Sequence, residues 1–97
     1  MTHKCNAYLT WKNSGDGIDS RMYIWNGHEI GKGMEGIKNI LKEFEKMPPK
    51  STILVFPAED IINDWYVNLR PLAKPAEDRQ IIIILSKYDE KGREVSP

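Results

Sequence analysis

The chain has 97 residues, a length that suits one domain built around a single core. Its 14 basic residues balance 14 acidic ones, and lysines and glutamates are interspersed, which disfavours binding to nucleic acid or to an anionic membrane. The longest apolar run, Ile81–Leu85, is too short to cross a bilayer. We therefore expect one domain over residues 1–97 and no membrane insertion within this chain. Its ordered core should span about residues 6–86, and the charged tail at 87–97 should be mobile.

The first third of the chain predicts three strands. Residues 6–12 alternate in side-chain character as a half-buried strand does, and the turn-forming residues at 13–17 predict a loop. Residues 21–25 are rich in strand-forming side chains, and Asn26–Gly27 follows them directly. Because both central positions of a type I′ turn need positive φ, Asn-Gly predicts a hairpin, with residues 28–30 as the returning strand.

A helix is predicted next, beginning near Met34. Apolar residues recur there at steps of three and four, which is the spacing of one helix face. These residues are Met34, Ile37, Ile40, Leu41, Phe44 and Met47. Pro48–Pro49 should end the helix, because proline lacks the N–H that a helix needs.

The second half predicts two strands that are continuously apolar. Ile53–Phe56 has no polar residue, which is typical of a strand covered on both faces, and Pro57 should end it. Residues 80–86 contain the continuous apolar run Ile81–Leu85 and form the last predicted strand. We expect these two apolar runs to be the innermost strands of the sheet.

A second helix is predicted between these strands, opening at residues 58–60. Its apolar face comprises Ile61, Ile62, Trp65, Leu69 and Leu72. Pro71 should end or kink it near Leu69, leaving residues 74–79 as a polar link.

The predicted order is strand, hairpin, helix, strand, helix, strand. Right-handed strand–helix–strand connections place the last strands parallel in the sheet. We therefore predict a two-layer α+β domain, with a mixed sheet of about four to five strands and two amphipathic helices packed on one face.

The segment Gly27–Gly33 precedes a helix and is superficially similar to a phosphate-binding loop. Three residues separate Gly27 from the Gly31–Lys32 pair where the P-loop motif needs four, and Gly33 stands where the motif needs a hydroxyl. The simpler interpretation is that the glycines permit a tight strand-to-helix turn. The alternative is an anion site at the helix N-terminus, with His28, Lys32 and Gly33 as candidate binding residues.

No metal site, cofactor or active site is predicted. His3, Cys5 and His28 lack the number and spacing of a metal site, and a single cysteine excludes an internal disulfide. Glu59 and Asp60 are adjacent acids whose simplest role is to complement the dipole of a helix start. Because no nucleophile accompanies them, we expect that the protein is not an enzyme.

The aromatic residues point to a possible partner surface. Trp11, Trp25 and Trp65 fall on apolar faces, so we expect them in the core. Tyr66 falls off the predicted helix face and is a candidate residue of a surface for a protein partner.

The order of elements over residues 21–86 resembles the periplasmic domain of the ExbD/TolR biopolymer-transport family. The resemblance rests on the hairpin segment Met22–Gly27, the helix face from Met34 to Phe44, the strand Thr52–Phe56 and the segment Ala58–Asp60. It implies two helices on a mixed sheet, no catalytic activity, and pairing with itself and with envelope partners. The family's intramembrane aspartate has no counterpart in this sequence, so no proton-driven role is carried over.

We therefore expect a non-catalytic binding or assembly module, which is the soluble part of a larger membrane-tethered or exported bacterial protein if the resemblance holds. It would contact a protein partner or a second copy through a sheet edge. The location would be periplasmic or otherwise exported with the resemblance, and cytoplasmic without it. The alternative is a small-ligand or anion-binding accessory domain that uses the Gly27–Gly33 loop.

Overall fold

The computed structural model describes residues 5–13, 21–56 and 69–95. The elements in chain order are β1 (Ala7–Asn13), β2 (Arg21–Trp25), β3 (His28–Lys32), α1 (Gly33–Glu45), β4 (Thr52–Val55), α3 (Arg70–Asp78) and β5 (Ile82–Leu85). The described residues thus form a five-stranded mixed sheet with two helices, and the predicted α+β class is confirmed.

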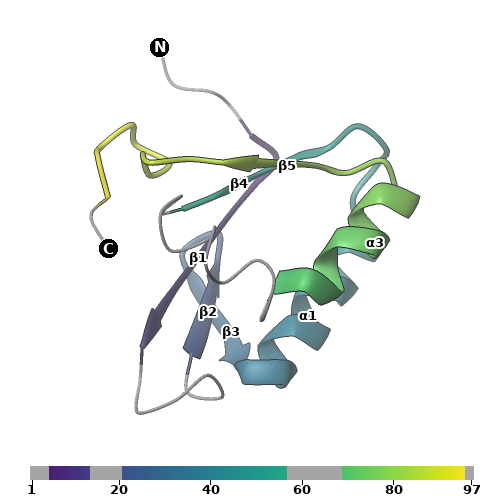
Figure 1. Cartoon of the computed structure of the whole chain (residues 1–97), viewed down its shortest axis with the longest axis horizontal. Helices are drawn as coiled ribbons and strands as arrows, with labels where there is room; N and C mark the ends of the chain where they lie inside the picture. The colour runs from purple at the N-terminus through teal and green to yellow at the C-terminus, as the bar shows by residue number, and fades with distance from the viewer. Residues whose placement is uncertain (1–4, 14–20, 57–68, 96–97) are drawn as a thin grey trace.

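The strands lie in the order β3-β2-β1-β4-β5, with β1 in the centre (Figure 1). β1 pairs antiparallel with β2, and β2 pairs antiparallel with β3. β4 runs parallel to both β1 and β5, as the strand–helix–strand order predicts.

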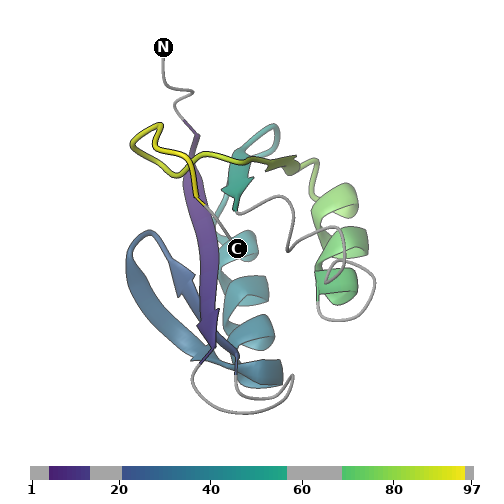
Figure 2. The same ribbon diagram turned by 60° about the vertical axis from the view of Figure 1, so that its left-hand side comes forward.

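Both helices pack on one face of the sheet, as expected (Figure 2). Three strands and both helices supply the centre of the core, because alternate residues of a strand point to the same face. The fully buried residues include Leu9, Tyr23, Ile37, Ile40, Phe44, Ile53, Val55, Leu69 and Leu72. Trp11 and Trp25 belong to the same core, which confirms their prediction, and Trp65 lies outside the described residues.

The predicted Asn26–Gly27 hairpin is confirmed. Both residues have positive φ, 51° and 83°, as a type I′ turn requires. The returning strand is longer than predicted and contains a bulge, since Ile24 pairs with Glu29 while Tyr23 pairs with Gly31. Ile30 is therefore the extra residue on β3, and its carbonyl accepts a hydrogen bond of 2.6 Å from Asn39 Nδ2 of α1.

The first predicted helix is confirmed, but Met34 does not belong to its buried face. The Met34 side chain is 56% exposed. The buried face is formed by Gly33, Gly36, Ile37, Ile40 and Phe44. Gly36 lies against the backbone of β3, so the side of α1 that carries Gly36 faces the sheet. Met34 lies on another side of the helix and is therefore exposed to solvent.

The helix that Pro71 is expected to end or kink near Leu69 lies almost wholly outside the described residues, but the predicted polar link at 74–79 is wrong. α3 begins at Arg70 and continues to Asp78, so the predicted polar link at 74–79 is largely helical. Pro71 lies in the first turn, where no intrahelical acceptor is available for an N–H and its absence costs nothing. Leu69 and Leu72 are buried as predicted. The predicted helix start at residues 58–60, with Ile61 and Ile62, lies outside the described residues.

The last strand is not an inner strand. β4 is buried on both faces from Ile53 to Val55, as predicted, whereas β5 lies at the edge of the sheet. Ile82 is 51% and Leu85 43% exposed. The crossover through α3 places β5 beside β4 on the side away from β1, which already occupies β4's other side. A continuous apolar run therefore marks an edge strand here.

Candidate functional site

The structure does not gather the predicted anion-binding residues into one site. His28 follows the hairpin turn at one end of β3, whereas Lys32 ends the strand and caps α1. Four residue steps of extended chain separate their Cα atoms by roughly 13 Å. Both are exposed, and Gly33 is buried at the first position of α1. His28, Lys32 and Gly33 do not line any of the three cavities described below.

Close packing explains the glycines of this loop. A Cβ built on Gly31 would lie 2.9 Å from the backbone nitrogen of Gly36, and one on Gly36 would lie 2.5 Å from the Gly31 carbonyl oxygen. Hence the backbone of α1 rests directly on β3. Glu35 lies in the first turn of the helix, where a bound anion would meet its negative charge.

The other sequence candidates give no catalytic or metal arrangement in the described residues. Tyr66, the acids Glu59 and Asp60, and His3 lie outside those residues. Cys5 is a partly exposed free thiol. Within residues 5–13, 21–56 and 69–95, no three metal-binding side chains group closely enough to hold an ion, and neither helix has the length and apolar character of a membrane span.

The face of the sheet opposite the helices is also apolar. Tyr8 lies beside Leu54, and Leu54 lies beside Ile84, so these three side chains form a row across β1, β4 and β5. Thr10 lies opposite Ile24 of β2. Apolar residues on the second face of a sheet indicate that something covers it or binds to it.

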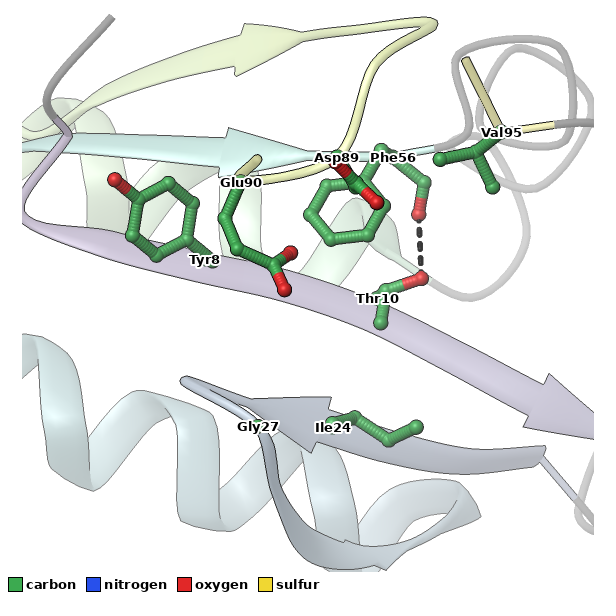
Figure 3. A pocket seen from close by; sticks show the side chains of 8 residues that line it. All are labelled: Tyr8, Thr10, Ile24, Gly27, Phe56, Asp89, Glu90 and Val95. Carbon is green, nitrogen blue, oxygen red and sulfur yellow. Dashed lines mark hydrogen bonds between the residues drawn. The ribbon is translucent and has the colours of Figure 1, made fainter. Parts of the chain in front are cut away.

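Two adjoining cavities hollow this second face. One has a volume of about 300 Å³ and the other about 370 Å³, and they share Tyr8, Gly27 and Glu90. We call them together the second-face groove. Its lining residues are Asn6, Tyr8, Thr10, Ile24, Asn26, Gly27, Phe56, Asp89, Glu90 and Val95. Figure 3 shows the acidic side chains of the C-terminal segment over β1, which carries Tyr8 and Thr10, with Ile24 on the neighbouring β2.

The C-terminal segment forms one wall of this groove. It folds back on itself, with a bridge between Tyr88 and Glu94. Asp89 Oδ1 accepts hydrogen bonds of 2.9 Å from the backbone N–H groups of Lys91 and Arg93. The Arg93 N–H, followed by that of Lys91 and by the Arg93 side-chain charge, holds the pKa of Asp89 below its ordinary value. The charge of Asp89 is thus already engaged in the turn.

Glu90 differs from its neighbour. Its carboxylate has no hydrogen-bonding or ion-pair partner in the described part of the chain. In Figure 3 the side chain extends over β1 between Tyr8 and Thr10. Glu90 is exposed to solvent, and because no lysine or arginine lines either cavity, its carboxylate has no cation beside it in the groove.

Two asparagines at one end of the groove add hydrogen-bond donors. Asn26 Oδ1 accepts from the backbone N–H of Tyr8, and Asn6 Oδ1 accepts from that of Thr52, each at 2.8 Å. Because the oxygen of each amide is engaged, the amide nitrogen is directed elsewhere. Neither nitrogen has a partner among the described residues.

A third cavity of about 240 Å³ lies where the hairpin turn meets the end of α1. Its charged residues, Glu43 and Lys46, pair with each other at 2.9 Å. Their charges offset each other, so this cavity offers a ligand no unbalanced charge.

The two edges of the sheet differ in chemistry. The N–H groups of Ile82 and Ser86 donate to the carbonyls of Ser51 and Val55 on the β4 side, so those of Ile83 and Leu85 point away from the sheet by alternation. No described strand covers them. All four residues of β5 are apolar.

The β3 edge carries three devices that discourage pairing: the bulge at Ile30, a glycine, and charged side chains. Glu29 of β3 pairs with Lys12 at 2.8 Å, and this contact lowers the pKa of Glu29. β5 has none of these devices. Of the two edge strands, β5 is thus the one without charged residues.

Comparison with protein-family models, curated proteins and solved structures finds no match to this chain. The ExbD/TolR resemblance therefore remains an expectation from the sequence. Sequence reasoning missed the second-face groove because its residues are far apart in the chain. The available signal was the apolar character of Tyr8 and Ile24 at strand positions that do not belong to the core.

Proposed function

We propose that this chain is a non-catalytic binding or assembly module that accepts a partner strand along the β5 edge. The observation that carries the proposal is an uncharged apolar strand whose outward N–H and C=O groups have no described partner. Such an edge is a template for another strand. The ExbD/TolR-like order of elements suggests further that a larger membrane-tethered or exported protein carries the module.

A second copy of the chain is a suitable partner strand. In an antiparallel pair with Ile84 on the two-fold axis, Ile83 of each copy lies opposite Leu85 of the other, and Ile82 lies opposite Ser86. No charged side chain falls within this paired region. The edge is therefore self-complementary.

The test compares Leu85→Pro with Leu85→Ser. Both variants remove an exposed apolar side chain, but only proline removes the outward N–H, and it does so without breaking a hydrogen bond to β4. We expect the light-scattering mass of the wild type to rise with concentration, the serine variant to associate more weakly, and the proline variant to stay monomeric.

Hydrogen exchange shows whether the edge is the contact. Association should protect the amides of Ile83 and Leu85, and a synthetic peptide of residues 80–87 should do the same at low protein concentration. A protein that stays monomeric throughout, and whose two amides the peptide leaves unprotected, would refute the proposal.

A further inference from the structure

We propose that the second-face groove binds an extended, basic segment of a partner protein, which places a lysine or arginine beside Glu90 and an apolar side chain over Tyr8 and Ile24. This surface lies over β1 and β2 and is separate from the β5 edge. The inference therefore stands independently of strand pairing.

Charge complementarity identifies the sign of the ligand. Glu90 has no partner in the described part of the chain, and the other acid of the groove, Asp89, is held by Arg93 and by backbone N–H groups. An anionic ligand would meet two carboxylates and no lining cation. A cation beside Glu90 would gain an ion pair, and the neighbouring Tyr8 ring adds a favourable surface for it.

The remaining chemistry identifies a peptide. The floor of the groove is apolar at Tyr8, Ile24 and Phe56, which suits an apolar side chain next to the charged one. The amide nitrogens of Asn6 and Asn26 are donors without described acceptors, and peptide carbonyls are acceptors without donors. A simple amine would use the Glu90 carboxylate alone and leave these features unmatched.

The probes are short synthetic peptides that alternate lysine and valine, with glutamate–valine peptides and free lysine as comparisons. Binding is measured by titration of the whole, isotope-labelled chain, with amide chemical shifts to locate it. We expect the lysine–valine peptides to shift the amides of Tyr8, Ile24 and Gly27, and to bind more weakly as salt is raised. Glutamate–valine peptides and free lysine should bind far more weakly.

Two variants form a matched pair. Glu90→Gln removes the charge in the groove, whereas Glu94→Gln removes a charge from the same segment outside the cavity lining. We expect Glu90→Gln to weaken binding of the lysine–valine peptides roughly five-fold, as loss of an exposed ion pair does, and Glu94→Gln to leave it nearly unchanged.

Other outcomes would overturn the inference. These are no binding of the basic peptides, shifts confined to other surfaces, equal effects of the two variants, or free lysine binding as tightly as the peptides. Leu85→Pro separates the two proposals, because it blocks the β5 edge and should leave peptide binding in the groove intact. If that variant abolished peptide binding, the peptides would be adding to the edge, and the groove would not be their site.

Discussion

The contact between α1 and β3 predicts that Gly36→Ala destabilises the protein although alanine favours helices. The new Cβ would lie 2.5 Å from the Gly31 carbonyl oxygen and 2.6 Å from Cδ2 of Tyr23. Ordinary contact begins at 3.4 Å, so the first distance must open by 0.9 Å (3.4 − 2.5). Neither neighbour moves easily, because one is backbone and the other is a fully buried ring.

The size of the effect follows from two opposing terms. Overpacking a rigid contact costs about 1–3 kcal/mol, and the backbone partner places this site near the upper limit. Alanine is about 1 kcal/mol more favourable than glycine inside a helix, which offsets part of this loss of stability. The expected net loss is about 2 kcal/mol, which lowers the melting temperature of a domain this size by about 10 °C.

Thermal and urea unfolding followed by circular dichroism measure this loss. Glu35→Ala, at the preceding exposed position of the same helix, is the matched control and should change stability by less than about 0.5 kcal/mol. If Gly36→Ala proved as stable as the wild type or more so, the close approach of the helix to β3 would not be what requires glycine.

Two further predictions concern the bulge and the C-terminal turn. Asn39→Ala should cost about 1 kcal/mol in urea unfolding, because the Ile30 carbonyl loses its donor; an unchanged midpoint would contradict this. The contribution of Asp89 to the turn should be full above its ordinary pKa of 3.8 and lost as pH falls through the lower folded value. Amide exchange at Lys91 and Arg93 should therefore report opening of the turn in acid, whereas Asp89→Asn, which keeps the oxygen acceptor, should show no such pH dependence.

Local patterns were sufficient to predict the elements that local chemistry determines. Asn26–Gly27 specifies its turn through the φ values that the turn needs, and the stripe from Ile37 to Phe44 specifies a helix through its period. The fold class follows from the order of these elements. Met34 was wrongly placed because periodicity gives the width of the apolar face, whereas the contact with Gly36 decides its direction.

The position of β5 could not be predicted from its composition. Continuous apolar runs at β4 and β5 look alike in sequence, but β4 has neighbours on both sides and β5 on one. An apolar composition indicates that both faces of a strand are covered, but it does not indicate whether the strand has a hydrogen-bonded neighbour on each side. That information resides in the topology, which depends on the whole chain.

The candidate site was hidden for a related reason. Tyr8, Ile24 and Glu90 come from the first strand, the hairpin and the C-terminal segment, and only the folded sheet brings them together. The Gly27–Gly33 loop gave a stronger sequence signal, yet its glycines serve the packing of α1 on β3. A conspicuous local motif thus has a structural role, while the second-face groove has no local motif.

The placement of charge separates the two surfaces that this fold exposes. β3 places its charged residues on the edge, where they discourage pairing, and β5 places none there. The second-face groove differs from both edges, because the unpaired carboxylate of Glu90 lies above an apolar surface. An uncharged edge selects a partner by backbone geometry, whereas a charged groove selects one by side-chain chemistry. If both proposals hold, the two partners would not compete for one surface, because the edge lies beyond β4 and the groove lies over β1 and β2.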